Sequence, residues 1–168
     1  MDPSANVALV GMPGVGKSTV GVLLAKRLRL QFVDTDLLIQ AGEGKSLREL
    51  IDVHGPAGFS AIEGRYVAAL EVKGHVIATG GSVVYQQDAM AGLRARATVI
   101  YLQTSAAELV RRVGDLSARG IVMKPGQTLQ DLCEERHPLY QRHAHLVVDV
   151  QGLAPEGAVT RITEALHP

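Results

Sequence analysis

Cysteine, tryptophan and net charge are scarce or absent in this sequence. The single cysteine, Cys133, excludes an internal disulfide bond and a cysteine-rich metal site. Lysine plus arginine and aspartate plus glutamate balance at 17 each, so the chain lacks the basic excess of a protein that binds nucleic acid or anionic membranes. No apolar run approaches the roughly 20 residues that a membrane-spanning helix needs. We therefore expect neither a nucleic-acid nor a membrane partner.

The first residues of the chain also lack the basic and apolar segments of a signal peptide. Together with the single cysteine, this favours the reducing cytoplasm as the location. The length of 168 residues fits one domain with a substantial core, and no repeat or linker divides the chain.

Short apolar runs alternate with amphipathic, helix-like segments along the chain. Strands are expected at residues 7–10, 31–33, 75–79, 97–102 and 146–150. Helices are expected at 17–29, from 47 to a break at 55–58, and at 59–72. A further helix is expected to begin at about 106, another to end at about 140, and a last one to lie at the C-terminal end. This alternation predicts an α/β fold with a largely parallel sheet covered by helices on both faces.

A phosphate-binding loop is the strongest motif of the sequence. The pattern G-x-x-x-x-G-K-[ST] is met by Gly11, Met12, Pro13, Gly14, Val15, Gly16, Lys17 and Ser18. Glycines let backbone N–H groups turn toward phosphate oxygens, and the following helix directs its positive end at the anion. Lys17 would reach the β- and γ-phosphates, and the Ser18 hydroxyl would bind Mg²⁺. A chance glycine-rich turn is the alternative.

The loop indicates a nucleoside triphosphate without specifying the reaction. The chain is too short for a separate motor domain, and no Asn-Lys-x-Asp segment that would read guanine follows the loop. ATP is therefore the expected nucleotide.

Two carboxylates, Asp34 and Asp36, follow the second expected strand, at the sheet edge where ligands collect in open α/β folds. In an extended chain residues i and i+2 share a side, so both carboxylates would face one cleft. One would help to hold Mg²⁺, and the other would orient or deprotonate a hydroxyl. The alternative is a solvated turn with a helix cap at Asp36.

A glycine turn and an arginine-containing segment complete the candidate site. Gly80 and Gly81 follow the third expected strand and would let the backbone approach a substrate, although a plain tight turn is the alternative. Arg112 and Arg119 flank a polar, glycine-containing segment that would close over ATP and exclude water. Solvated surface arginines are the competing interpretation.

Taken together, these motifs resemble the shikimate kinase family over nearly the whole chain. The likeness rests on the phosphate-binding loop, Asp34-Thr35-Asp36, Gly58-Phe59, Gly80-Gly81, Arg119 and the segment 135–140. It implies one P-loop domain over residues 1–168 with a five-stranded parallel sheet and nucleoside-monophosphate-kinase-like architecture. It also implies a substrate-binding region at about 36–62 and a lid at about 114–127.

The resemblance also implies roles for individual residues. Lys17, Asp36 and Arg119 would be catalytic, with Asp36 as the base, and Ser18 and Asp34 would hold Mg²⁺. Arg112 would pack on the adenine of ATP. The remaining nucleotide contacts would come from the loop residues with Thr19 and Pro155, and the remaining substrate contacts from Phe59, Ser60, Gly80, Gly81, Ser82 and Arg136, which would hold the carboxylate.

Three positions depart from the pattern of this family. Ser60 stands where the family usually has an arginine that pairs with the substrate carboxylate. The third glycine of the turn is Ser82, and Gly120 replaces the proline after Arg119. The first departure is the serious one, because losing one partner of a buried charge pair typically costs about 2–5 kcal/mol. Arg48 or Arg65 would have to substitute, or the substrate would lack shikimate's carboxylate.

The sequence thus leaves several functions open. The leading hypothesis is an ATP- and Mg²⁺-dependent kinase of shikimate or another hydroxylated small molecule, acting as a monomer. A nucleoside or nucleotide kinase is the alternative enzyme. A non-catalytic ATP-binding regulator is the alternative from a different class.

Overall fold

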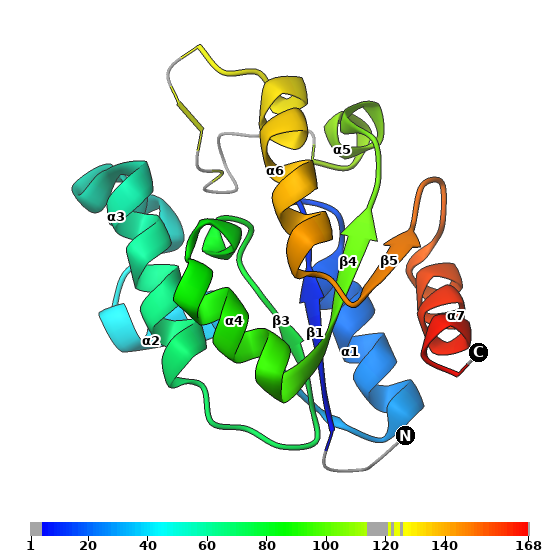
Figure 1. The fold of residues 1–168 in the computed structure, drawn as a ribbon. Coiled ribbons are helices and arrows are strands. Elements are labelled where there is room, and N and C mark those ends of the chain that lie inside the picture. Colours follow the sequence, from blue (N-terminus) through cyan, green and yellow to red (C-terminus); the bar gives the residue numbers. More distant parts are fainter. Residues whose placement is uncertain (1–4, 114–120, 122, 125, 168) are drawn as a thin grey trace.

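A computed structural model of the chain describes residues 5–113, 121, 123–124 and 126–167. Figure 1 shows that these residues form an α/β domain with a central sheet. The strands are β1 (Asn6–Val10), β2 (Gln31–Asp34), β3 (His75–Ala78), β4 (Ala97–Gln103) and β5 (Leu146–Asp149). Their order across the sheet is β2-β3-β1-β4-β5, and each neighbouring pair is parallel.

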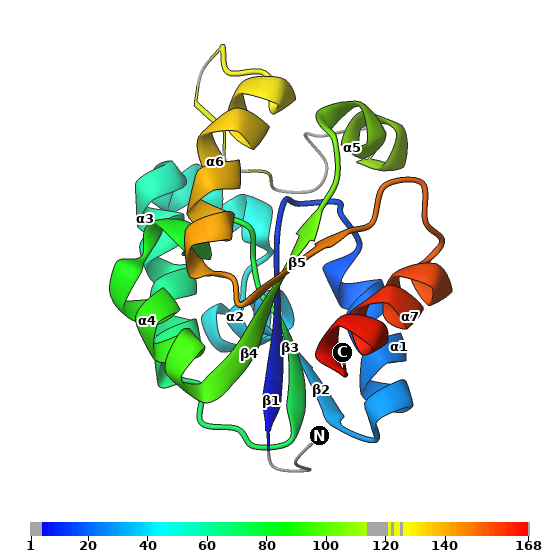
Figure 2. The same cartoon turned by 45° about the vertical axis from the view of Figure 1, so that its right-hand side comes forward.

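The helices connect successive strands and cover both faces of the sheet. They are α1 (Lys17–Leu28), α2 (Thr35–Glu43), α3 (Leu47–Ala69), α4 (Gln87–Arg96), α5 (Ala106–Val113), α6 (Leu129–His143) and α7 (Pro155–Leu166), with a 3₁₀ turn η1 at Val83–Tyr85. Helices α1 and α7 pack together on one face, whereas α4 and α6 lie against β4 on the other (Figure 2). None of the helices in the described part of the chain is long and apolar enough to cross a bilayer.

Local sequence signals explain several helix boundaries. Ser46 and Glu49 form the expected capping box, so α3 begins at Leu47 as predicted. The expected break also occurs, because Gly55 adopts φ 67° and ψ 177° and kinks α3. The second part of α3 resumes directly after this kink and ends at Ala69, three residues before the predicted end at 72. The sequence analysis did not anticipate α2, η1 or α4.

Two apolar cores support the two sides of the domain. The larger core surrounds the sheet, and Val7 to Val10 of β1 are completely buried in it. A smaller core holds α2 against α3 through Ile39, Leu50, Phe59 and Ile62. Helices α2 and α3 thus form a unit with its own packing beside the sheet. The expected lid falls largely on residues 114–120, 122 and 125, which lie outside the described residues.

Candidate active site

The phosphate-binding loop connects β1 to α1 at the carboxyl edge of the sheet. Three of its glycines have positive φ, with 146° at Gly11, 82° at Gly14 and 102° at Gly16. A Cβ atom at Gly11 would lie 2.8 Å from the carbonyl oxygen of Leu102. The loop can therefore follow this path only with glycine at these positions.

The N-terminus of α1 is prepared for an anion. Its N-cap residue is Gly16, which provides no side-chain cap, and the first turn contains no acidic residue. The N–H groups of this turn therefore have no competing carboxylate or hydroxyl from a capping side chain. Ser18 and Thr19 line the adjoining cavity. These features fit the phosphates of a nucleotide.

Lys17 is buried at the base of the loop. Its Nζ donates hydrogen bonds to the carbonyl oxygens of Gly11 at 2.8 Å and Met12 at 2.9 Å. Burial lowers the pKa of Lys17 to about 8, and the carboxylates of Asp36 and Glu63 oppose this change. Lys17 is therefore mainly protonated at neutral pH and supplies a positive charge where phosphates would lie.

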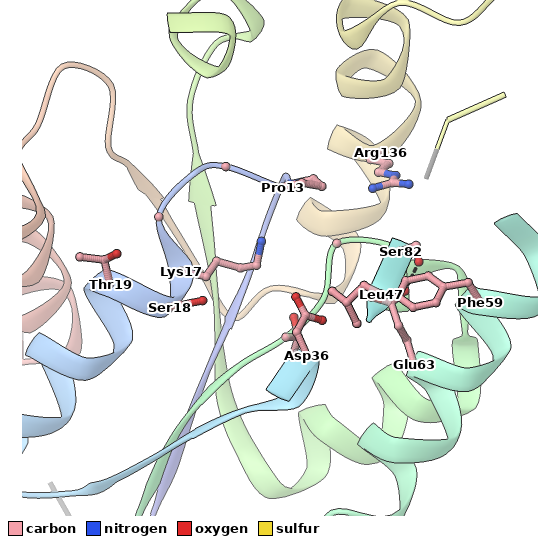
Figure 3. Close-up of a pocket in the computed structure, with 14 residues that line it drawn as sticks. Pro13, Lys17, Ser18, Thr19, Asp36, Leu47, Phe59, Glu63, Ser82 and Arg136 are labelled. Atoms are coloured by element: carbon pink, nitrogen blue, oxygen red, sulfur yellow. Dashed lines mark hydrogen bonds between the residues drawn. The ribbon is translucent and has the colours of Figure 1, made fainter. Parts of the chain in front are cut away.

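A cavity of about 420 Å³ joins the loop to the α2–α3 unit (Figure 3). Its wall is formed by Pro13, Gly14, Gly16, Lys17, Ser18, Thr19, Asp36, Leu47, Phe59, Glu63, Thr79, Gly81, Ser82 and Arg136. In Figure 3, Lys17 and Asp36 point into the same space, and Arg136 reaches toward it from α6. The structure thus brings residues from distant sequence segments together around one cavity. Leu47, Glu63 and Thr79 were not anticipated.

The two aspartates lie close together, but the predicted reason is wrong. Asp36 belongs to the first turn of α2 and does not continue the strand. Asp34 is the N-cap of α2, and its Oδ1 accepts a hydrogen bond of 2.9 Å from the backbone N–H of Asp36. The cap predicted at Asp36 is also misplaced, because Asp34 provides it. Asp34 itself does not line the cavity.

Asp36 occupies an environment that suits a proton acceptor. Its Oδ1 is buried and has no hydrogen-bond partner among the described residues. Burial first, and then the charge of Asp34, raise the pKa of Asp36 to about 6, although Lys17 opposes this shift. A carboxylate with such a pKa is ionised at neutral pH and is a better base than an exposed aspartate.

We expect this pKa to appear in the pH profile. Because the base must be ionised, kcat/KM should fall about tenfold per pH unit below about pH 6. Because its pKa is raised, Asp36 becomes protonated at a higher pH than an exposed carboxyl group does. The acidic limb of the rate profile therefore moves to higher pH. Steady-state rates between pH 4.5 and 8.5 provide the measurement. An acidic limb centred near pH 4 would contradict this environment for Asp36.

Glu63 is the main site residue that the sequence analysis missed. It is 1% exposed, and its Oε2 accepts a hydrogen bond from the Ser82 hydroxyl. Burial first, and then the charge of Asp36, raise the pKa of Glu63 to about 8, although Arg136 and Lys17 oppose this shift. An acidic residue at helical spacing from Phe59 on an otherwise apolar face of α3 was the signal for it.

Glu63→Gln should change the pH dependence of stability. Between the ordinary pKa of glutamate and about 8, folded Glu63 keeps a proton that the unfolded chain releases, so wild-type stability falls as pH rises. Glutamine cannot titrate and keeps an acceptor for Ser82. We expect the Tm of the variant relative to wild type to increase by about 4 °C or more between pH 5 and pH 8. The exposed Glu71→Gln serves as control, and equal changes in both variants would refute the prediction.

Arg136 and Tyr140 extend from α6 toward the glycine turn. Arg136 is 1% exposed, its Nε donates to the Tyr85 hydroxyl at 3.1 Å, and its guanidinium lies 5.2 Å from the centre of the Tyr85 ring. The Tyr140 hydroxyl donates a hydrogen bond of 2.7 Å to the carbonyl oxygen of Gly81. Helix α6 therefore fixes both a cation and the backbone of the turn.

Gly81→Ala tests how tightly the turn approaches the phosphate-binding loop. A Cβ atom at Gly81 would lie 2.8 Å from Cδ of Pro13 and 3.2 Å from Nη1 of Arg136. The added methyl group should displace the loop, Arg136 or both, and we expect kcat/KM to decrease at least about 100-fold. Gly157→Ala in α7 is the control, because its Cβ would make only ordinary contacts, at 3.7 Å from the side chain of Leu153. Equal activity of both variants would argue against a constrained turn.

Other predicted residues surround a second cavity, of about 310 Å³, on the outer side of the loop. Gly14, Gly16, Thr19, Arg112 and Pro155 contribute to its wall. The guanidinium of Arg112 donates hydrogen bonds to the carbonyl oxygens of Val15 at 3.1 Å, Val150 at 3.1 Å and Leu153 at 3.2 Å. Arg112 is therefore fixed between the loop and the segment that precedes α7.

Several predicted positions lie outside the active-site cavity. Ser60 is 4% exposed, and its hydroxyl donates a hydrogen bond of 2.9 Å to the carbonyl oxygen of Ser82. Gly80 packs beside the Glu63 carboxylate, behind the cavity wall. Neither Arg48 nor Arg65 reaches the cavity, since they pair with Asp52 and Glu43. Arg119 lies outside the described residues.

Comparison with known proteins agrees with this geometry. A family model described as "Shikimate kinase" matches residues 13–167. The chain belongs to the shikimate kinase family. The family's protein from Pseudomonas paraeruginosa is 40% identical over 165 residues, which are 96% of either chain. The one from Chromohalobacter salexigens is 40% identical over 161 residues, which are 93% of this chain and 88% of the relative.

Solved structures of the family have the same fold. Shikimate kinase from Acinetobacter baumannii in complex with shikimate superposes with a TM-score of 0.87 at 30% identity, covering 97% of this chain and 93% of that chain. Deoxyadenosine kinase from M. mycoides shares the fold alone. It superposes with a TM-score of 0.59 at 16% identity, covering 96% of this chain and 98% of that chain. The predicted P-loop kinase fold is thus confirmed. As a family member, the chain is a phosphotransferase that acts on an alcohol group and uses ATP with Mg²⁺.

Proposed function

We propose that the protein transfers the γ-phosphoryl group of ATP to a hydroxyl of shikimate or of a related hydroxylated metabolite. The observation that carries this proposal is the placement of Asp36. Its buried Oδ1, which has no hydrogen-bond partner among the described residues, shares one cavity with Lys17 and the N-terminus of α1. A proton acceptor and a phosphate-binding cation thus face each other across a space that suits a small molecule.

The residues of the loop fit the nucleotide. Backbone N–H groups at the N-terminus of α1 would bind the phosphates, with Lys17 at the β- and γ-phosphates. The Ser18 hydroxyl and the Asp34 carboxylate would hold Mg²⁺, which neutralises charge on the phosphates when it is bound. The cavity beside Arg112 and Pro155 would take the adenine.

The α2–α3 unit and α6 would bind the acceptor. Asp36 would orient one hydroxyl and take its proton as the oxygen attacks phosphorus, and Arg136 would hold the acid end of the acceptor. Phe59 and the turn from Gly80 to Ser82 would enclose the ring. Much of the rate enhancement would come from positioning, because these groups are fixed by the small core and by α6. Arg119 would add positive charge from the lid.

A transfer assay with the full-length protein tests this proposal. The protein is incubated with Mg-ATP and shikimate, other hydroxy acids, polyols or deoxynucleosides, and the phosphorylated product is identified by ³¹P NMR. We expect phosphorylation of shikimate or a related hydroxy acid. Phosphorylation of deoxynucleosides alone would favour the nucleoside-kinase alternative. ATP binding without transfer to any acceptor would favour the non-catalytic regulator.

A further inference from the structure

Arg136 is the only arginine among the described residues that line the active-site cavity. It reaches toward the cavity from α6 (Figure 3). Its Nη1 lies beside the glycine turn, because a Cβ atom at Gly81 would be 3.2 Å from it. Residue 60 is a serine and supplies no second guanidinium, so the orientation of Arg136 determines how an acceptor carboxylate is bound.

Tyr85 holds one side of the Arg136 guanidinium. Its hydroxyl accepts a hydrogen bond of 3.1 Å from Nε of Arg136, and the centre of its ring lies 5.2 Å from the guanidinium carbon. Tyr85 belongs to the 3₁₀ turn η1, in which Val83 and Val84 are completely buried in the larger core. Because Tyr85 already binds the Nε–H group, a carboxylate that pairs with Arg136 approaches the end formed by Nη1 and Nη2.

The same hydroxyl also contacts Glu135. Tyr85 donates a hydrogen bond of 2.5 Å to Oε1 of Glu135, while Gln127 and Lys124 donate to Oε2 at 3.0 Å and 3.1 Å. The hydrogen bond from Tyr85, followed by that from Lys124, holds the pKa of Glu135 below its usual range. Glu135 is therefore an anion at neutral pH, and one hydroxyl group separates it from Nε of Arg136.

The Tyr85 hydroxyl thus stands between a cation and an anion. Nε of Arg136 and Oε1 of Glu135 are both within hydrogen-bond distance of one oxygen atom. Removing that oxygen would leave a charged donor and a charged acceptor near each other without their present partner. A charge-assisted hydrogen bond between them would draw the guanidinium toward Glu135 and away from the active-site cavity.

Tyr85 and Glu135 act from behind the active site. Neither residue lines the active-site cavity, but both line a neighbouring cavity of about 360 Å³, which shares Arg136 as a wall residue. Their effect on an acceptor carboxylate therefore passes through Arg136. Asp36 and Lys17, which serve the transfer itself, lie at other points of the active-site wall.

Building on the function proposed above, we infer that Tyr85 is a positioning residue for the carboxylate of the acceptor. Its hydroxyl holds Arg136 by Nε and keeps Glu135 from pairing with it, so the Nη end of the guanidinium meets the carboxylate. Loss of this hydroxyl weakens binding of the acid and leaves ATP binding and the transfer step intact.

Tyr85→Phe tests this inference, because phenylalanine keeps the ring and removes only the hydroxyl. KM for shikimate should rise, and its calorimetric affinity without ATP should fall, at least about tenfold, as expected when a hydrogen bond to a charged group is lost. Both kcat and KM for ATP should change less than about threefold. A shikimate analogue with a hydroxymethyl group in place of the carboxylate should have the same kcat/KM in both proteins.

Two further variants separate positioning from a general structural effect. Tyr66→Phe is the matched control, because the Tyr66 hydroxyl likewise donates to a glutamate, Glu43, at 3.2 Å, and Tyr66 lines neither cavity. It should leave all these constants unchanged. Adding Glu135→Gln to Tyr85→Phe removes the competing anion and should increase the shikimate affinity of Tyr85→Phe at least about threefold. A purely structural role of Tyr85 predicts a further loss instead.

Each outcome separates the two proposals. If shikimate is phosphorylated but Tyr85→Phe leaves its KM unchanged, or weakens the hydroxymethyl analogue equally, the positioning role is refuted and the kinase activity stands. Failure of Glu135→Gln to recover affinity also refutes the role. If shikimate binds in a Tyr85-dependent manner but is not phosphorylated, the positioning role stands and the proposed transfer fails. Absence of shikimate binding overturns both.

Discussion

Asp36→Asn is expected to lower kcat by about 10²- to 10⁴-fold, the range for loss of a positioned general base. The asparagine has nearly the same shape, but its amide cannot take a proton from the acceptor hydroxyl. ATP affinity should change little, because the loop and the N-terminus of α1 carry the phosphate contacts. The backbone hydrogen bond from residue 36 to Asp34 also remains. Single-turnover rates and calorimetric ATP binding measure the two effects separately.

Asp88→Asn is the matched control for this experiment. Asp88 is an exposed aspartate in the first turn of α4 and does not line the active-site cavity. This control variant should retain wild-type activity. A fully active Asp36→Asn would show that the base lies elsewhere, and a parallel loss of ATP binding would assign Asp36 to the nucleotide.

Lys17→Ala is expected to reduce kcat/KM for ATP by about 10²- to 10³-fold, as found when one preorganised donor to developing charge is removed. Lys17 is buried and carries its charge beside the loop, where low dielectric strengthens the interaction with phosphates. Its removal also leaves the carbonyl oxygens of Gly11 and Met12 without their present donor, so the loop itself should become less ordered.

Lys26→Ala in the same helix controls for general effects on α1, because Lys26 is exposed near the C-terminal end of the helix. It should leave kcat/KM unchanged. Measuring KM for ATP and kcat separately shows whether Lys17 acts in the ground state or mainly in transfer. If Lys17→Ala retained wild-type kcat/KM, the lysine would have only a structural role as donor to the loop.

Local sequence patterns determined the phosphate-binding loop and much of the secondary structure. The loop follows from the backbone itself, because the positive φ values of Gly11, Gly14 and Gly16 require glycine wherever this turn occurs. The strands were recognisable because a buried parallel strand is a short, continuous apolar run. The capping box likewise determined where α3 begins, because its two partners, Ser46 and Glu49, lie within four adjacent residues.

Helices with weaker local signals were harder to recognise. Helix α4 has neither a side-chain cap at Gln86 nor a strongly apolar composition, so its existence depends on packing against α3 and β4. Helix α2 begins directly after a strand, and the sequence therefore suggested extended chain where Asp36 is helical. The two aspartates still converge, because the cap at Asp34 joins them.

The sequence alone determined that this chain binds phosphates, because the geometry of that loop is encoded in adjacent residues. The tertiary structure decided which side chains face the acceptor, because those contacts join segments far apart along the chain. Glu63 became part of the site through its contact with Ser82, whereas Ser60 lies outside the active-site cavity and forms hydrogen bonds with Ser82 and Gln86. The position of Arg136 between two cavities was likewise set by the packing of α6, which no local pattern specifies.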